Sequence, residues 1–159
     1  MTGRRLLPFL ALGSALLPAA HAAARSAVVD HVADGDTIQV EIGNREEDVR
    51  FIGIDTPEVY GGVECGGRPA SASMKRMLKP GDRVTLVRDR SQDNRDYYGR
   101  LLRYVELDGR DLGRKQVRKG WAVVYVFDDP FARLDSYRRA ERKARDADRG
   151  AWGRCGGFG

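Results

Sequence analysis

A chain of 159 residues is long enough for one domain with a substantial core. Hydrophobic residues make up 42% and charged residues 32%, an ordinary globular balance, and the formal net charge of +5 is compatible with a polyanionic partner without proving one. With only two cysteines and two histidines, a zinc site is nearly excluded and a Ser-His-Asp triad is hard to build.

The N-terminus has the pattern of a targeting segment. Arg4 and Arg5 precede an uncharged apolar run over residues 6–20, and Ala-His-Ala at 20–22 supplies the small-x-small pattern of a signal-peptidase site. The run is short for a membrane span, so a retained anchor is the less favoured alternative. We predict a signal peptide over residues 1–22 and a secreted or periplasmic protein, which after cleavage has 26 basic and 23 acidic residues, a net charge of +3.

The body of the chain alternates strand and helix signals. Apolar alternation or β-rich composition predicts strands at residues 27–32, 37–42, 47–54, 83–88, 100–107 and 121–127. Helical spacing predicts helices at 70–78 and 111–119 and a long last helix that starts at 129–130 and stops at Gly150. About five strands with helices between and after them suggest an α+β fold, a small antiparallel barrel plus helices, without internal repeats or an interdomain linker. Barrels that bind oligonucleotides commonly have the five-stranded OB topology, so a five-stranded OB-fold β-barrel with about three α-helices is the expected architecture.

The two cysteines, Cys65 and Cys155, are each flanked by glycine. An even cysteine count in an exported chain suggests one disulfide. We predict that it ties the glycine-rich loop at residues 60–68 to the C-terminal tail at 153–159.

The last helix carries both signs of charge at i, i+4 spacing, in the pairs Asp135–Arg139, Glu141–Arg145 and Arg142–Asp146. This pattern favours a solvated, salt-bridged face over a DNA-binding stripe.

Two acidic turns lie close to strands. Asp36 belongs to an Asp-Gly-Asp-Thr turn at 34–37, and Asp55 opens an Asp-Thr-Pro-Glu corner at 55–58 that Pro57 stiffens. Their carboxylates are hard oxygen ligands that suit Ca²⁺ or Mg²⁺, and Glu58 is close enough in sequence to hold or deprotonate a water at the metal. The alternative is a pair of solvated β-turns with ordinary turn residues.

Arg50 and Asp55 have opposite parity in an ideal strand and would point to opposite faces. They share a site only if the strand is distorted, and Gly53 is where we expect that distortion.

A second candidate segment is Asp-Tyr-Tyr-Gly-Arg at 96–100, which places Tyr97, Tyr98 and Arg100 around one glycine turn. A ring to stack a base and a cation for a phosphate suit a nucleotide site. An aromatic hairpin corner with an exposed arginine is the equally open alternative.

In combination these motifs are familiar. DGDT, R-x4-DTPE, a helix that starts near PASA, YGR, and G-W-A-x-V-Y before a long final helix resemble the thermonuclease (staphylococcal nuclease-like) family, over residues 27–152. The resemblance implies an OB-type barrel with three helices. It also implies Ca²⁺-dependent hydrolysis of DNA and RNA phosphodiesters that leaves 3′-phosphates.

The resemblance also implies roles for individual residues. Asp36, Asp55 and the Thr56 carbonyl match the calcium ligands, and Asp34 matches an acidic residue of the outer shell. The remaining matches are Glu58 for the general base, Arg50 and Arg100 for the phosphate-binding arginines, and Tyr98 and Tyr125 for the nucleotide pocket.

Two positions depart from the family pattern. Tyr97 stands where a lysine is expected and Phe127 where a second pocket tyrosine is expected, and both lie at the nucleotide subsite. The loop after Glu58 is also shorter and carries Cys65.

The sequence therefore predicts a monomeric, secreted, Ca²⁺-dependent nuclease with a catalytic domain at 27–152, acting on DNA and RNA without stable membrane association. One rival is a non-catalytic OB-fold nucleic-acid-binding module, which the presence of Asp36, Asp55, Glu58, Arg50 and Arg100 argues against. A calcium-stabilised structural domain is the other rival, and it leaves the two arginines unexplained.

Overall fold

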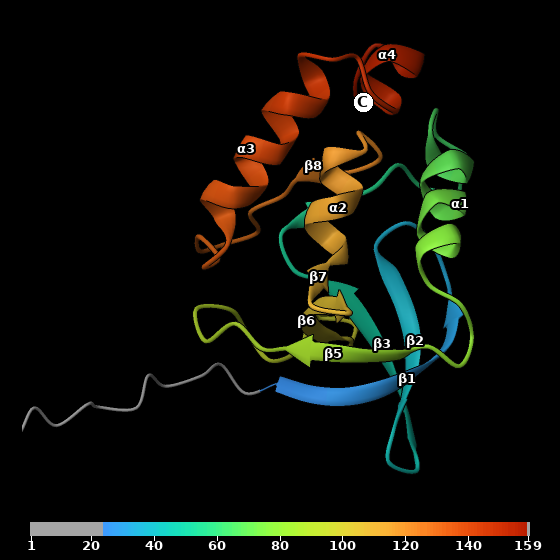
Figure 1. Ribbon diagram of the computed structural model, residues 1–159, viewed down its shortest axis with the longest axis vertical. Helices are drawn as coiled ribbons and strands as arrows, with labels where there is room; N and C mark the ends of the chain where they lie inside the picture. The colour runs from blue at the N-terminus through green and yellow to red at the C-terminus, as the bar shows by residue number, and fades with distance from the viewer. Residues whose placement is uncertain (1–23, 159) are drawn as a thin grey trace, which may run out of the picture.

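A computed structural model of the chain describes residues 24–158 (Figure 1). The predicted signal peptide lies outside this range. Within the described residues, no helix is both long enough and apolar enough to cross a membrane.

The centre of the fold is a closed five-stranded barrel. Its strands are β1 (Ala24–Val32), β2 (Thr37–Ile42), β3 (Arg45–Phe51), β5 (Arg83–Val87) and β6 (Leu101–Leu107), in the order β3-β2-β1-β5-β6. Neighbours in this order pair antiparallel, while β3 and β6 close the barrel as a parallel pair. The predicted five-stranded α+β barrel is confirmed, with one parallel pair and a short extra strand, β7 (Arg110–Asp111), on β6.

Alternation along the strands builds the core. In β2, Ile38 and Val40 are fully buried, and in β3 Val49 and Phe51 point to the same interior. Successive strand residues face opposite sides, so the polar residues between them reach the outside. Burying each such side chain contributes about 1.5–3 kcal/mol.

Four helices gather on one side of the barrel, and Figure 1 shows α2 between α1 and α3. They are α1 (Gly67–Met77), α2 (Leu112–Arg118), α3 (Leu134–Arg145) and α4 (Ala151–Cys155). The first begins three residues before the predicted start, because Gly66 has a φ of 92° and turns the chain there. The fourth was not predicted, since five residues are too few for a helical period to be recognised.

The last long helix begins later than predicted, at Leu134 instead of residue 129. The segment before it is irregular and is held by the loop after β5: Ser91 donates to the Pro130 carbonyl and Gln92 to the Asp129 carbonyl. Phe131 is consequently buried in the core ahead of the helix.

The predicted strand at 121–127 is largely wrong. Only β8 (Val123–Val124) forms, and it pairs with β4 (Ile54–Asp55) in a separate two-stranded sheet. Of the apolar run, Ala122 is buried in the core and Val124 and Val126 pack against it, without a long ladder of strand hydrogen bonds. The effect of the run is local: the Tyr125 N–H donates to the Gly53 carbonyl at 3.1 Å, which fixes the segment beside the β3–β4 corner.

The salt-bridged face predicted for α3 is also wrong. None of the three predicted i, i+4 pairs appears among the ion pairs of residues 24–158. Glu141 instead accepts a hydrogen bond from the Val124 N–H at 2.7 Å, so this carboxylate is withdrawn from the helix surface. The arginines of α3 are left without the predicted partners.

The predicted disulfide is present between Cys65 and Cys155, 90 residues apart. It joins the loop before α1 to the end of α4. The last helix is thereby tied to the segment that follows the Asp-Thr-Pro-Glu corner.

Candidate functional site

The corner between β3 and β4 brings Arg50 and Asp55 together. Gly53 has a φ of 77°, and a side chain there would collide with the ring of Phe131. This turn interrupts the strand, so the parity argument no longer applies, and Arg50 Nη2 lies 2.8 Å from Asp55 Oδ1. The distortion predicted at Gly53 is confirmed.

The turn between β1 and β2 presents Asp36. The Asp34 carboxylate accepts the N–H groups of Asp36 at 3.0 Å and Thr37 at 2.8 Å, which closes the turn on itself. Asp36 Oδ2 then accepts both the N–H and the hydroxyl of Thr56 at 2.9 Å. The two acidic turns are thus bonded to each other, and Asp36 is only 5% exposed.

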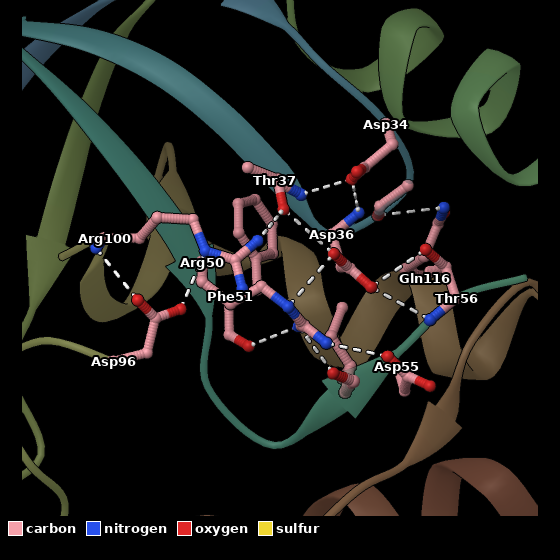
Figure 2. A network of polar contacts seen from close by, with 12 residues as sticks. Asp34, Asp36, Thr37, Arg50, Phe51, Asp55, Thr56, Asp96, Arg100 and Gln116 are labelled. Atoms are coloured by element: carbon pink, nitrogen blue, oxygen red, sulfur yellow. Dashed lines mark hydrogen bonds and ion pairs between the residues drawn. The ribbon is translucent and has the colours of Figure 1, made fainter. Parts of the chain in front are cut away.

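The Arg50 guanidinium lies between the two aspartates (Figure 2). Its Nε is 3.2 Å from Asp36 Oδ1, and Nη1 donates to the Ile54 carbonyl at 2.7 Å and the Phe51 carbonyl at 3.1 Å. Together with the Asp55 contact, these bonds hold the planar group in one orientation. Arg50 is therefore positioned before any substrate arrives.

Arg100 approaches the same network from the loop before β6. Its Nε lies 2.7 Å from Asp96 Oδ2, and its Nη1 is 3.4 Å from the Thr37 hydroxyl (Figure 2). The guanidinium carbon also lies 5.3 Å from the centre of the Tyr98 ring. Thr37 in turn donates to Asp36 at 3.1 Å, so Arg100 is linked to the acidic turn.

Glu58 is exposed at the end of the corner, and its backbone is fixed by a reciprocal pair of bonds. The Glu58 N–H donates to Glu64 Oε2, and the Glu64 N–H donates to the Glu58 carbonyl, both at 3.0 Å. Cys65 follows directly and is held by the disulfide. The Glu58 carboxylate accepts no hydrogen bond from residues 24–158, and it lines the same pocket as the arginines.

Burial and the charge of neighbouring carboxylates raise the pKa of two carboxyl groups of this site, Asp34 and Asp55. Burial, reinforced by the charge of Asp36, raises the pKa of Asp34 to about 6. The pKa of Asp55 is also raised, first by burial and then by Asp36, Glu58 and Glu64, against the lowering effect of Arg50. Crowded carboxylates of this kind are relieved by a nearby cation.

The donors for a metal are oxygen atoms. No group of three or more His, Cys, Asp or Glu among residues 24–158 is arranged to hold a metal ion. Asp36, Asp55 and the Thr56 carbonyl would have to be completed by water or substrate oxygens. Asp55 Oδ2 accepts no hydrogen bond from the described residues, so it is available to a cation. A hard ion that tolerates an open, oxygen-rich shell fits this set.

One pocket of about 900 Å³ contains the whole candidate site. All nine site residues predicted from the sequence, apart from the cysteines, line it: Asp34, Asp36, Arg50, Asp55, Thr56, Glu58, Tyr98, Arg100 and Tyr125. The two cysteines do not line the pocket, and their disulfide holds the loop that follows Glu58. The pocket is of the size that takes a small ligand or a nucleotide.

Four exposed aromatic side chains line the same pocket. Tyr97 is 97% exposed, Tyr98 81% and Phe127 77%, and Tyr125 lies 6.4 Å from Phe127 between ring centres. Exposed rings beside arginines suit stacking of bases. Both positions that depart from the family pattern, Tyr97 and Phe127, are thus at this pocket.

Sequence reasoning missed several supporting residues. Asp96 orients Arg100, and the two are joined across a turn instead of on one helix face, so their spacing in the sequence did not predict the pair. Gln116, fully buried on α2, donates to the carbonyls of Ala70 at 2.8 Å and Gly35 at 3.4 Å. A lone amide within the predicted helix was the only hint of this role. Glu64 carried no signal, because its partner Glu58 is found only through the loop's fold.

Known proteins resemble this chain over most of its length. Residues 48–154 match the staphylococcal nuclease homologue family. Endonuclease YncB of Bacillus subtilis (strain 168) is 33% identical over 132 residues, which cover 80% of this chain and 62% of that protein. The SPbeta prophage-derived endonuclease YokF of the same organism is also 33% identical over 132 residues, or 80% of this chain and 44% of that protein. The Thermonuclease of Staphylococcus hyicus is 31% identical over 127 residues, which cover 78% and 73% of the two chains.

The chain belongs to the staphylococcal nuclease homologue family. The matched region contains Arg50, Glu58 and Arg100 and begins after Asp36. The chain spans less than two thirds of the length of the two Bacillus subtilis relatives.

Proposed function

We propose that this protein is an exported, Ca²⁺-dependent nuclease that hydrolyses phosphodiester bonds of DNA and RNA and leaves 3′-phosphates. The observation that carries the proposal is the joint placement of two aspartates, two arginines and one unpaired glutamate in a single 900 Å³ pocket. The family relation supports nucleic acid as the substrate, and the nuclease names of the relatives support hydrolysis.

The chain's own residues divide the work. Arg50 and Arg100 bind the phosphate oxygens and stabilise the charge that grows on them in the transition state. Glu58 takes a proton from the attacking water, since its carboxylate is free of hydrogen bonds to the described residues. The water oxygen then bonds to phosphorus and the bond to the 5′ oxygen breaks. The 5′ oxygen takes up a proton from water and leaves as a hydroxyl, and the phosphate stays on the 3′ side.

The metal's residues are Asp36, Asp55 and the Thr56 carbonyl, with Asp34 behind them. Bound Ca²⁺ would supply positive charge that neutralises the phosphate. Tyr98 and Tyr125 would contact the nucleotide from the rim of the pocket. We expect a monomer with no stable membrane association once the signal peptide is removed.

A plasmid-digestion assay with Ca²⁺ and with a chelator tests the proposal. We expect cleavage only with Ca²⁺ and products that end in 3′-phosphate. Asp36→Ala should lose cleavage and bind Ca²⁺ more weakly in calorimetry, with the barrel still folded. Nucleic-acid binding without cleavage under any metal condition would support the non-catalytic module. Ca²⁺ binding without effect on nucleic acid would support the structural domain.

Export has a separate test, because it concerns residues outside the described range. N-terminal sequencing of the protein from the periplasm or medium of the producing cell should find a start near residue 23. An intact Met1 on the mature protein would reject the signal peptide.

A further inference from the structure

A second concave surface lies between α2 and α3, with a volume of about 460 Å³. We call it the α2–α3 groove. It shares no lining residue with the 900 Å³ pocket. Six of its ten lining residues are basic: Arg110, Arg114, Lys115, Arg118, Arg139 and Lys143.

These six cations have no anionic partners within residues 24–158, since none of them occurs in an ion pair. The single acidic lining residue, Asp111, is already satisfied. It accepts from the Arg133 guanidinium at 2.7 Å, the Tyr137 hydroxyl at 2.8 Å and the Arg114 N–H at 2.9 Å. The groove therefore presents uncompensated positive charge.

The two helices display their cations in rows. Arg114 and Arg118 on α2, and Arg139 and Lys143 on α3, are each spaced i, i+4, which puts each pair on one helix face about 6 Å apart along the axis. That spacing is on the order of the distance between successive phosphates of an extended single strand.

The groove lies on the opposite face of α2 from the Asp-Gly-Asp-Thr turn at residues 34–37. Gln116 is two residues from both Arg114 and Arg118, about 200° around the helix, and its amide contacts the carbonyl of Gly35 in the acidic turn. A ligand in the groove is therefore separated from the pocket by the body of α2.

We infer that the α2–α3 groove is a second nucleic-acid-binding site, which holds the phosphodiester backbone of a long polymer away from the bond being cleaved. The identity of the polymer rests on the proposed function. Contacts to phosphates carry no sequence information, so binding in the groove is independent of base sequence. An anionic membrane fits less well, because the exposed large apolar side chains of residues 24–158 all lie outside the groove: Tyr60, Val63, Tyr97, Tyr98, Tyr125 and Phe127.

The test compares two variants with equal loss of charge. The groove variant carries Arg114→Gln, Arg118→Gln, Arg139→Gln and Lys143→Gln. The control variant removes four exposed cations from α1, β5 and the connection between them, which line neither the groove nor the pocket: Lys75→Gln, Arg76→Gln, Lys79→Gln and Arg83→Gln. Both are made in a Glu58→Gln background and studied with chelator present, so that no cleavage occurs.

Binding of a fluorescent single-stranded oligonucleotide is measured by anisotropy over a series of salt concentrations. We expect the groove variant to lose about tenfold or more in affinity. The slope of log K against log salt should fall by about 0.7 for each neutralised residue that contacts a phosphate. The control variant should stay close to the parent.

If both variants lost the same affinity for the oligonucleotide, the effect would be due to net charge alone and the inference would be overturned. Unchanged oligonucleotide affinity in the groove variant would overturn it as well. Loss of binding to phosphatidylglycerol vesicles with unchanged oligonucleotide binding would identify a membrane surface instead. Thermal unfolding monitors the fold, and if the fourfold variant does not fold, Arg114→Gln with Arg118→Gln should show about half the slope change. Since the readout is binding without turnover, a failed nuclease assay leaves this result unaffected.

Discussion

The pocket and the α2–α3 groove both present arginines, but they hold them in opposite ways. In the pocket, Arg50 makes four polar contacts and Arg100 is paired with Asp96. In the groove, the six cations form no ion pair with residues 24–158. The same residue type is thus rigid and compensated in one place and free in the other.

The difference separates positioning from attraction. A guanidinium fixed by carboxylates and carbonyls is already in place for a reacting phosphate, which limits the entropy lost at the chemical step. Its charge, however, is largely cancelled by its partners. Unpaired cations keep their full charge and attract a polyanion from a distance, at the cost of geometric precision. The first arrangement suits catalysis, and the second suits the capture of a long substrate.

The largest expected difference between the pocket and the groove is produced by Glu58→Gln. The substitution keeps the size of the side chain but removes its ability to take a proton, so kcat should fall by about 10²–10⁴. Oligonucleotide binding in the groove and Ca²⁺ affinity should change far less. Steady-state kinetics at saturating Ca²⁺ provide the measurement.

The pH–rate profile of the same variant distinguishes two possible roles of Glu58. Loss of the acidic limb in Glu58→Gln supports proton transfer, whereas a lowered but unshifted profile indicates that Glu58 orients the water. A kcat near that of the parent would refute both roles.

Removing the disulfide should affect the pocket more than the groove. For a 90-residue separation, the chain-entropy model predicts that Cys65→Ser with Cys155→Ser lowers the free energy of unfolding by about 4–5 kcal/mol, often less in practice. Because Cys65 adjoins the Glu64–Glu58 bonds, kcat of the folded fraction should fall while oligonucleotide affinity is kept.

Denaturant unfolding and kinetics below the transition measure the two effects. Thiol titration of unreduced, unfolded parent protein should find no free thiol, and two free thiols would contradict the bridge. An unchanged kcat in the double variant would show that α4 does not support the Glu58 loop.

Asp89 supports both regions, because it anchors the segment that runs from the pocket to α3. It is buried and accepts hydrogen bonds from Tyr104, Ser91 and the Ala132 N–H. Burial by itself raises the pKa of Asp89, but these hydrogen bonds outweigh it and leave the pKa below its usual value. Asp89→Asn should lower the free energy of unfolding by about 1–3 kcal/mol at neutral pH.

The pH dependence of this effect has a defined sign. A carboxyl group with a lowered folded-state pKa stabilises the fold above its unfolded pKa and loses that contribution as pH falls through the folded value. The stability difference between parent and Asp89→Asn should therefore shrink below about pH 4. A difference that is constant with pH would show that packing, not charge, is lost.

The smallest expected effect concerns the pocket rim. Tyr97→Lys with Phe127→Tyr adds one cation and one hydroxyl at the nucleotide subsite. A 3′,5′-diphosphonucleoside inhibitor should then bind a few-fold tighter, because an exposed ion pair typically contributes about 0.2–1 kcal/mol to the free energy. Groove binding of a long oligonucleotide should not change. An unaltered inhibitor Kd would show that these two positions do not touch the ligand.

Contiguous residues determined the barrel and the corners of the site. The alternation in residues 37–42 appears as β2 with the same bounds, and the Asp-Gly-Asp-Thr turn closes through bonds within four residues. Gly53 was identifiable because the parity of Arg50 and Asp55 demanded a distortion between them. Such features are readable since the atoms that decide them are close together in the chain.

Only the tertiary structure decided the partners of polar groups whose partner lies far away in the chain or in its backbone. Glu141 bonds to the Val124 backbone instead of to an arginine one turn away, and Asp36 bonds to Thr56 twenty residues on. The run at 121–127 resembles a strand by composition, but a ladder needs a neighbour, and only Val123 and Val124 meet one. The α2–α3 groove likewise forms only when the fold brings together two helices that are separate in the sequence. Its net charge also depends on the fold, because the tertiary structure decides which carboxylates are already paired with other groups.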